Sequence, residues 1–303
     1  MNRICKFLFA FLISTTCLQA NDFPKEIIIV GDSLSDSGNS RAALDVALLF
    51  FRTSPITDGT TWPVLLSSAL GAKTLKPSTQ GGTNFAYVGA LTKGAFALFP
   101  NPSLTEQANS IPANTNTNHP VLVFGGANDI FFDPTTITNP GVMAASDIID
   151  ILTNLHSRKF DTLITFSLPD VGLIPSSGAM SSDYTRESLD FNVTLKSGLE
   201  SLSFPVLQID LFPLFNEVIF DPNRFGFTNS TEAPVLDGGG GTNTAGYVFF
   251  YDGTHPTEAT HEIISQYVFT IINAPNFLNA MAQKPMYRHH LNEHKFVLFS
   301  HTA

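Results

Sequence analysis

The sequence predicts an α/β sandwich in which helices cover a parallel sheet. Short apolar runs, typical of strands buried on both faces, alternate along the chain with segments whose apolar residues recur at helical spacing. An order of strand, loop and helix, repeated, is typical of parallel sheets with covering helices. The predicted strands comprise residues 26–30 (EIIIV), 120–124 (PVLVF), 162–166 (TLITF) and 205–211 (PVLQIDL). The predicted helices comprise residues 143–155, 184–202 and 261–272.

Two polar stretches between these elements are predicted to be loops. Residues 76–82 are rich in Pro, Ser, Thr and Gly, and residues 221–247 contain a run of glycines with many Asn and Thr. The second stretch comes shortly before His255, so it is either a lid or rim over a site or a plain surface insertion. No internal repeat or linker divides the chain, which predicts a single domain.

The first 20 residues predict a secretory signal peptide. Arg3 and Lys6 supply its positive region, residues 7–14 (FLFAFLIS) are apolar, and Ala20 is a small residue suited to cleavage. The apolar run is much shorter than the ~20 residues that span a bilayer. We therefore expect a secreted protein, extracellular or periplasmic, whose mature domain is residues 21–303. A lipid anchor on Cys17 is the less favoured alternative.

Charge and cysteine content exclude several classes of function. The chain has 16 Lys and Arg against 26 Asp and Glu, and removal of Arg3 and Lys6 would make it more acidic still. Such a balance disfavours nucleic acid and anionic lipid as partners. Both cysteines, Cys5 and Cys17, lie in the predicted signal peptide, so the mature chain would lack disulfides and cysteine-based sites. No second long apolar run is present, so no stable membrane insertion is expected.

Ser33 directly follows the first predicted strand, in the sequence Gly31-Asp32-Ser33-Leu34. Ligands of open parallel sheets bind at the carboxyl ends of the strands. A serine at the entrance of a helix there has free N–H groups and a positive dipole beside its hydroxyl. Serine is also a common helix N-cap, so the position of Ser33 alone does not identify a nucleophile.

Asp252 and His255 supply the second part of the argument. Asp252 precedes His255 by three residues, and Gly253 between them allows a tight turn. Asp252 can then accept a hydrogen bond from one imidazole nitrogen and leave the other free for a serine hydroxyl. That is the orienting role of the carboxylate in a Ser-His-Asp triad. The order Ser33, Asp252, His255 along the chain favours this function over a chance pairing of surface residues.

Two further segments offer donors for an oxyanion hole. Asn128, in Gly125-Gly126-Ala127-Asn128-Asp129, follows the second predicted strand, so we expect its amide at the same edge of the sheet. Gly89 offers a backbone N–H that a substrate can approach without hindrance from a side chain. With the N–H of Ser33, these groups provide three donors for a tetrahedral oxyanion. By itself, a Gly-Gly-x-Asn segment is usually only a turn.

Taken together, these segments resemble the GDSL lipases, also called SGNH hydrolases. The four blocks, in the order of that family, are residues 31–39 (GDSLSDSGN), 84–90 (NFAYVGA), 126–129 (GAND) and 252–257 (DGTHPT). The resemblance implies a flavodoxin-like fold, a three-layer α/β/α sandwich with a central parallel sheet. It also implies that Ser33, Gly89, Asn128 and His255 are the residues that name the family and that Asp252 completes the triad. In the second block relatives often have two glycines before the alanine, where this chain has Val88-Gly89.

The chain also resembles one bacterial branch of that family. The long first block, the segment around Trp62, residues 124–130 (FGGANDI) and residues 168–175 (LPDVGLIP) look like secreted phospholipases A, lysophospholipases and glycerophospholipid:cholesterol acyltransferases. The implied activity is deacylation of a lysophospholipid or phospholipid, with acyl transfer to another alcohol as a variant. No metal or organic cofactor is implied. A carbohydrate O-acetylesterase is the alternative enzyme, and a non-catalytic binding protein is the alternative outside enzymes.

Phe residues near the blocks and His residues near the C-terminus are the remaining candidates for a functional role. Most of the Phe residues near the four blocks are expected to lie in the core, and some could line an acyl groove; the candidates are Phe96, Phe99, Phe131, Phe132, Phe225 and Phe227. His289, His290, His294 and His301 crowd the C-terminal region without a metal-binding frame, which predicts a solvated tail. No G-x-S-x-G segment is present, which disfavours an ordinary α/β-hydrolase.

Overall fold

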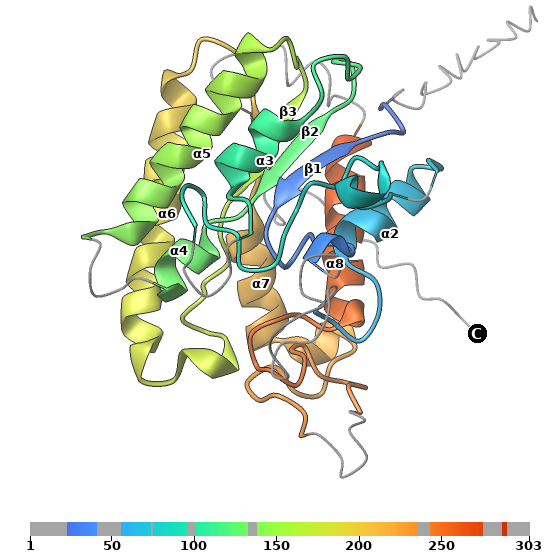
Figure 1. Ribbon diagram of the computed structural model, residues 1–303. Helices are drawn as coiled ribbons and strands as arrows, with labels where there is room; N and C mark the ends of the chain where they lie inside the picture. The colour runs from blue at the N-terminus through green and yellow to red at the C-terminus, as the bar shows by residue number, and fades with distance from the viewer. Residues whose placement is uncertain are drawn as a thin grey trace, which may run out of the picture.

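The computed structural model of the protein is an α/β/α sandwich built on a parallel sheet (Figure 1). It describes residues 23–40, 56–73, 75–95, 101–132, 138–235, 243–274 and 287–289. The strands are β1 (Ile28–Gly31), β2 (Val121–Phe124), β3 (Leu163–Phe166), β4 (Leu207–Ile209) and β5 (Tyr287–His289). They pair in that order and every pairing is parallel, as the sequence predicts.

Helices cover both faces of the sheet, on one side α5 and α6 and on the other α2 and α8 (Figure 1). The helices are α2 (Trp62–Ala69), α3 (Leu104–Ser110), α4 (Ala127–Phe132), α5 (Pro140–Ser157), α6 (Ser181–Ser201), α7 (Leu211–Phe220) and α8 (Glu258–Ile272). Short 3-10 turns are η1 (Ser78–Gln80), η2 (Pro175–Met180) and η3 (Pro222–Phe225). The three-layer fold expected from the sequence is therefore confirmed.

The central strands are apolar because both of their faces are covered. Every residue of β1 to β4 is buried, which explains why they appear in the sequence as continuous apolar runs instead of alternating ones. In α5 the buried residues recur every three or four positions, as in Ala144, Ile148, Ile151 and Leu155. That stripe faces the core, while the opposite side of the helix faces solvent.

The segment 83–87 runs alongside β1 on the edge away from β2. The N–H of Ile29 donates to the carbonyl of Thr83 at 3.0 Å, and the N–H of Phe85 donates to the carbonyl of Ile29 at 2.8 Å. Ile29 and Asn84 form an isolated parallel bridge. The segment therefore extends the sheet and carries the chain toward Gly89 at the carboxyl end of β1.

Three aromatic rings pack beneath the carboxyl ends of the strands. Trp62 contacts Phe124 and Phe166, with ring centroids 6.3 and 5.3 Å apart, and the two Phe rings are 4.9 Å apart. The Trp62 indole N–H donates to the hydroxyl of Ser35 at 3.2 Å. The first turn of α2 thus supports the turn that carries Ser33.

The structure differs from the sequence prediction in two of these elements. Residues 287–289, predicted to lie in a solvated tail, pair with β4 as a fifth strand. The strand predicted at 205–211 ends at Ile209, because Asp210 and Leu211 begin helix α7. The predicted signal peptide at 1–20 lies outside the described residues, as do Phe96, Phe99, His290, His294 and His301.

Candidate active site

A cavity of about 470 Å³ lies at the carboxyl ends of the strands. This volume is typical of a pocket for a small organic ligand. The five site residues predicted from the sequence all line it, namely Ser33, Gly89, Asn128, Asp252 and His255. Segments far apart in the chain are therefore brought to one cavity wall.

Ser33 lies in a tight turn that follows β1. The carbonyl of Asp32 accepts the N–H groups of Ser35 and Asp36, both at 3.0 Å. The sequence suggested that Ser33 lies at the entrance of a helix. In the structure, helical residues begin only at Asn39, so Ser33 lies in the turn before them. The capping role belongs to Asp36, whose carboxylate accepts the N–H groups of Gly38 and Asn39 at 2.8 Å.

Ser33, His255 and Asp252 form a continuous hydrogen-bonded chain. The Nε2 atom of His255 is 2.8 Å from the Oγ atom of Ser33, and its Nδ1 atom is 2.6 Å from Oδ2 of Asp252. With the proton on Nδ1 donated to the carboxylate, Nε2 is free to accept the serine proton. The geometry is that of a nucleophile, a base and an orienting acid.

Asp252 is held as a carboxylate by its own turn. Burial raises the pKa of its carboxyl, but the His255 ring and the N–H groups of His255 and Thr254 outweigh burial and lower the pKa below its usual value. The two N–H groups both donate to Oδ1 at 2.9 Å. Asp252 therefore stays ionised and available to stabilise an imidazolium.

Gly253 makes this turn possible. Its φ of 68° lies in the left-handed region, which favours glycine because a side chain there is strained. A Cβ atom at this position would also meet Pro175 at 3.2 Å. The turn is further fixed by the N–H of Ser176, which donates to the Gly253 carbonyl at 3.0 Å.

A network of asparagine side chains ties the Ser33 turn to the segment that leads to Gly89. The Asn84 amide donates to the carbonyl of Ser35 at 2.7 Å. The Asn39 amide donates to the carbonyls of Asn84 and Ala86 at 2.8 and 2.9 Å. Both asparagines are fully buried. The first two sequence blocks thus belong to one rigid unit, which the residue types alone did not reveal.

Gly89 and Asn128 approach each other at the cavity wall. Gly89 has a φ of 69°, which again favours glycine. The Asn128 amide donates one hydrogen bond to the carbonyl of Ala90 at 3.0 Å, and an amide nitrogen carries a second hydrogen. Asn128 lies in the first turn of α4, so its segment is the start of a helix and not only a turn.

Asp32 is a cavity residue that the sequence analysis did not single out. It directly precedes Ser33, is almost completely buried and accepts the N–H of Leu34 at 3.0 Å. Burial raises the pKa of its carboxyl to about 6, although the Leu34 hydrogen bond and the charge of His255 act in the opposite direction. The sequence feature that could have pointed to Asp32 is its position directly before Ser33 in Gly31-Asp32-Ser33-Leu34.

The remainder of the cavity wall is largely apolar. Its apolar residues include Val88, Phe124, Phe131, Leu168, Phe215 and Phe249. Of the Phe residues expected to form an acyl groove, Phe131 is confirmed as a lining residue. Phe225 and Phe227 lie outside the cavity and pack against the core, as expected for most of these candidates. The side chain of Phe132 lies outside the described part of the structure.

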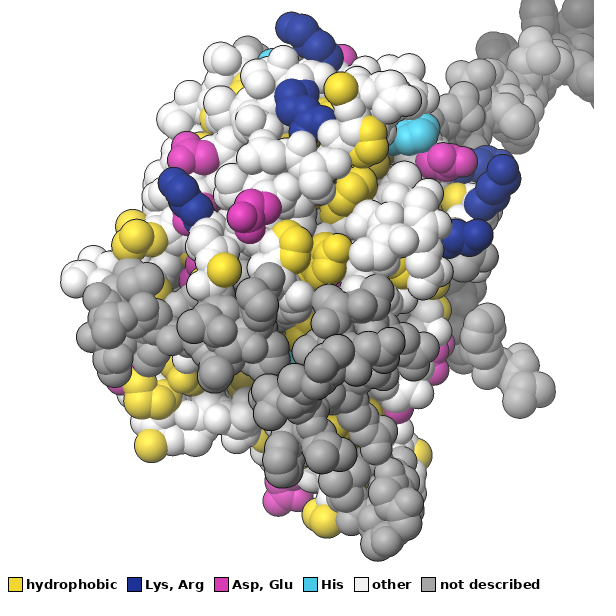
Figure 2. Space-filling model, in the orientation of Figure 1, with side chains coloured by type: hydrophobic (Ala, Val, Ile, Leu, Met, Phe, Trp, Pro, Cys, Tyr) yellow, Lys and Arg dark blue, Asp and Glu magenta, His cyan; other side chains and the backbone are white. Residues whose placement is uncertain are grey.

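The described residues contain neither a metal-binding cluster nor a membrane-spanning helix. No cluster of three or more His, Cys, Asp or Glu side chains there is placed to hold a metal ion. Among the helices that the structure describes, none combines the length and apolarity needed to cross a bilayer. On the face drawn in Figure 2, Lys and Arg side chains are dispersed among uncharged and acidic ones.

Comparison with known proteins gives a consistent result. A family model described as GDSL-like lipase/acylhydrolase matches residues 27–268. Esterase EstA of Pseudomonas aeruginosa is 24% identical, over 86% of this chain and 49% of the esterase. A GDSL esterase/lipase of Arabidopsis thaliana is 22% identical, over 84% of this chain and 91% of that protein. The chain thus spans about half the length of the Pseudomonas esterase.

One solved structure similar to this chain is a lipase/acylhydrolase from Enterococcus faecalis. It is 16% identical, with a TM-score of 0.48, over 82% of this chain and 95% of that protein.

Proposed function

The chain belongs to the GDSL-like lipase/acylhydrolase family, and we propose that it is a secreted serine esterase that cleaves acyl esters of lysophospholipids and phospholipids. One observation carries the proposal: the hydrogen-bonded chain from Ser33 through His255 to Asp252 opens onto a largely apolar cavity. A polar reaction centre beside an apolar wall suits an ester whose acyl part is a hydrocarbon chain.

The proposed reaction proceeds through an acyl-enzyme. His255 takes the proton of Ser33 as the hydroxyl oxygen attacks the ester carbonyl carbon and the carbonyl becomes a tetrahedral oxyanion. Collapse of this intermediate breaks the bond to the alcohol, which leaves with the proton from His255. Water then attacks the acyl-serine, with His255 again as base, and releases the fatty acid. Asp252 keeps the imidazole in the required tautomer throughout.

The oxyanion is assigned to the N–H groups of Ser33 and Gly89 and to the amide of Asn128. All three residues line the cavity. The hydrogen bond from Asn128 to the Ala90 carbonyl fixes the orientation of the amide before substrate arrives. Donors fixed in this way stabilise developing charge without the energetic cost of reorganising at the moment of reaction.

Lysophospholipids are the proposed preferred substrates. Phe131, Phe215 and Phe249 in the cavity wall would bury the acyl chain at ~0.8 kcal/mol per CH₂. The chain is acidic overall, which weakens its attraction to an anionic bilayer. A single-chain lipid exchanges from micelles and reaches the cavity without insertion of the protein into a membrane.

Acyl transfer is a second proposed outcome of the same intermediate. The acyl-serine is released by water in hydrolysis and by another alcohol in transfer, and both require only that the acceptor reach His255. The sequence likeness to the branch with phospholipases and acyltransferases supports testing both acceptors.

Product analysis tests the proposed function. Purified mature protein and Ser33→Ala are incubated with a lysophospholipid, a diacyl phospholipid and an acetylated glycan under one detergent condition, with and without a sterol as acceptor. We expect fatty acid release from the wild-type protein alone, with the highest kcat/KM for the lysophospholipid. A fluorophosphonate should label the wild-type protein and leave Ser33→Ala unlabelled.

Other results lead to different conclusions. Preference for the acetylated glycan would identify a carbohydrate O-acetylesterase. Preference for the diacyl lipid would mean that the protein engages membranes directly. If the correctly folded wild-type protein shows neither labelling nor turnover, the chain is a binding protein of the same fold.

A further inference from the structure

Asp129 ties the segment that follows Gly89 to helix α4. The N–H of Thr92 donates to both carboxyl oxygens of Asp129, at 3.2 and 3.1 Å. The Thr92 hydroxyl oxygen is also 2.8 Å from Oδ1 of Asp129. Thr92 is completely buried, so water does not compete for these contacts. Asp129 lies next to Asn128 in α4 and takes no part in the proposed reaction itself.

The segment 88–92 is held by helices on two sides. From α3, the Leu104 N–H donates to the Leu91 carbonyl at 2.9 Å, and the Thr105 hydroxyl donates to the Thr92 carbonyl at 2.9 Å. From α4, Asn128 holds Ala90 and Asp129 holds Thr92. The two adjacent α4 residues thus fix the segment at two points, both within three residues of Gly89.

We propose that Asp129 is a positioning residue of the oxyanion hole, which with Thr92 holds the Gly89 N–H and the Asn128 amide in register with Ser33. The inference rests on the proposed function, because it takes Gly89 and Asn128 as the oxyanion donors. Displacement of a catalytic group by about 1 Å can cost up to ~10²-fold in rate. A tie between the two donor-bearing segments is therefore a direct determinant of turnover.

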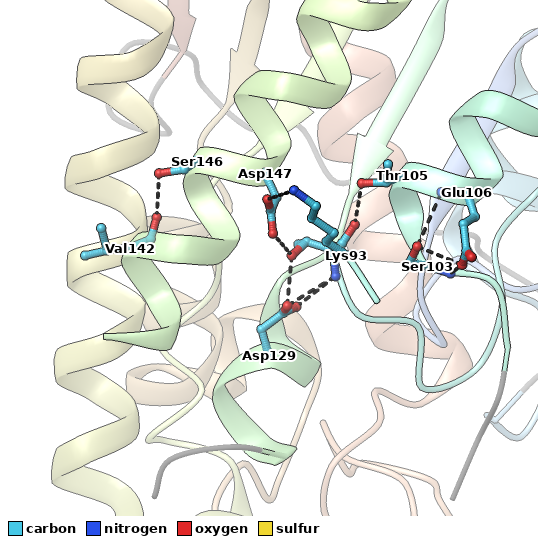
Figure 3. Close-up of polar contacts among 9 residues, drawn as sticks. Lys93, Ser103, Thr105, Glu106, Asp129, Val142, Ser146 and Asp147 are labelled. Carbon is cyan, nitrogen blue, oxygen red and sulfur yellow. Dashed lines mark hydrogen bonds and ion pairs between the residues drawn. The ribbon is translucent and has the colours of Figure 1, made fainter. Parts of the chain in front are cut away.

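The contacts of the Thr92 hydroxyl also bear on which of two carboxyls is protonated. The Thr92 hydroxyl oxygen is 2.8 Å from Asp129 Oδ1 and 3.0 Å from Asp147 Oδ2, and Figure 3 shows Asp129 on α4 and Asp147 on α5 directed toward the same point. A hydroxyl has one hydrogen and donates to only one of two acceptors. A proton on one of the two carboxyls, donated to the hydroxyl oxygen, satisfies both contacts.

The proton belongs to Asp129. Lys93 lies 4.0 Å from Asp147 and places a positive charge beside that carboxyl. Burial of Asp129, together with the nearby Asp147 charge, raises the pKa of the Asp129 carboxyl to about 7 despite the opposing hydrogen bonds from Thr92. A neutral Asp129 also avoids placing a negative charge beside the donors that hold the oxyanion.

Asparagine at position 129 reproduces the neutral acid. Its carbonyl oxygen can accept the Thr92 N–H, and its NH₂ can donate to the Thr92 hydroxyl. Alanine removes both contacts. Comparison of Asp129→Asn with Asp129→Ala therefore tests whether turnover depends on the hydrogen bonds to Thr92.

The test measures kcat and KM for a soluble ester with the full chain. The variants are Asp129→Asn, Asp129→Ala, Asn128→Ala, the Asn128→Ala/Asp129→Ala double variant and Glu187→Ala. Glu187 is a buried acid that joins α6 to the N–H of Gly141 in α5 and does not line the cavity. The Glu187→Ala variant is the control for a loss of stability that leaves the oxyanion hole intact. The thermal midpoint of every variant is recorded.

We expect Asp129→Ala to lower kcat by ~10- to 10²-fold with KM nearly unchanged, and Asp129→Asn to retain most of kcat. The double variant should be at most about threefold slower than Asn128→Ala, because residues that act as a unit are non-additive. Glu187→Ala should lower the thermal midpoint and leave kcat unchanged.

An unchanged kcat in Asp129→Ala, a folded Asp129→Asn as slow as Asp129→Ala, or full additivity in the double variant would each overturn the inference. These results leave the proposed function intact as long as fluorophosphonate labels Ser33 in the wild-type protein. Absence of labelling and turnover in the wild-type protein would overturn both.

Discussion

The Nε2 atom of His255 lies 2.8 Å from the Oγ atom of Ser33, although 222 positions separate the two residues in the chain. The turn after β1 and the turn before α8 meet at the carboxyl edge of the sheet to form this contact. This is the edge at which ligands of open parallel sheets bind.

Ser33→Ala and His255→Ala are each expected to remove nearly all ester hydrolysis while the fold is retained. The two residues act as a unit, so the double variant should be hardly slower than either single one. Initial rates on a soluble ester and circular dichroism of each variant check this. Substantial turnover by correctly folded Ser33→Ala would rule out Ser33 as the nucleophile.

Asn128→Ala is expected to lower kcat and leave KM nearly unchanged. The amide is needed most when negative charge develops on the carbonyl oxygen, and loss of one such donor typically costs ~10²–10³ in kcat. Steady-state kinetics on the same ester separate the two constants. A raised KM with an unchanged kcat would identify Asn128 as a substrate-binding residue instead.

Ile219→Trp is expected to shift the substrate preference toward short acyl chains. Ile219 lines the cavity from α7, so a larger side chain removes room for several methylenes, each worth ~0.8 kcal/mol. We expect kcat/KM to fall by about tenfold or more for long-chain esters and to change little for acetyl esters.

Phe220→Trp is the matched control for this change, since Phe220 is adjacent, 73% exposed and outside the cavity lining. Equal profiles for the two variants across a series of acyl chain lengths would mean that the acyl chain binds elsewhere.

The free energy of unfolding of the wild-type protein, compared with that of the Asp129→Asn variant, is expected to fall as the pH rises. The pKa of Asp129 is about 7 in the folded protein, above the ordinary value of 3.8 that applies when the chain is unfolded. Between these values the unfolded chain has released the proton while the folded protein retains it, so each rise in pH favours unfolding. Below pH 4 the effect vanishes, and above pH 7 it is complete.

Thermal unfolding of both proteins from pH 4.5 to 8 measures this difference. The midpoint of Asp129→Asn minus that of the wild-type protein should grow up to about pH 7 and then level off. Asp32 also titrates with a raised pKa, but it is present in both proteins and its effect cancels. A constant difference across the range would contradict protonation of Asp129 in the folded state.

We expect the protein to be exported, to begin near Asn21 after cleavage, and to be indifferent to reductant. Cleavage after Ala20 would remove Cys5 and Cys17, the two cysteines of the sequence. Intact-mass measurement of the protein from the culture medium or periplasm gives the first residue. A mass that retains Cys17, with or without a lipid, would contradict the predicted cleavage.

The parts of the molecule that follow from local sequence could be predicted. The strands of the sheet are short apolar runs, and Asp252, Gly253 and His255 form their turn within four residues, so pattern and residue type were sufficient. Gly89 and Asn128 were proposed as oxyanion donors from their own segments and were supported by the resemblance of the four blocks; the structure places both at the same cavity as Ser33.

Contacts between distant segments set the features that were missed. Helix α7 begins at Leu211 because the Ser167 hydroxyl, at the end of a neighbouring strand, accepts the N–H groups of Leu211 and Phe212 at 2.9 and 3.1 Å. The apolar run 205–211 contains no local sign of that boundary. Nearness to the blocks in sequence also did not single out Phe215 from α7 and Phe249 from the loop before His255, which line the cavity wall.

The turn around Gly253 has a consequence for how activity can be lost. Asp252 binds the backbone of its own turn as well as the His255 ring, so the acid and the base form one small rigid body. Ser33 belongs to a second rigid body, held by Asn39 and Asn84. The contact between Nε2 of His255 and Oγ of Ser33 is where these two bodies meet. In the proposed reaction, a displacement that separates these two atoms would leave Ser33 without its base while Asp252 and His255 stay hydrogen-bonded to each other.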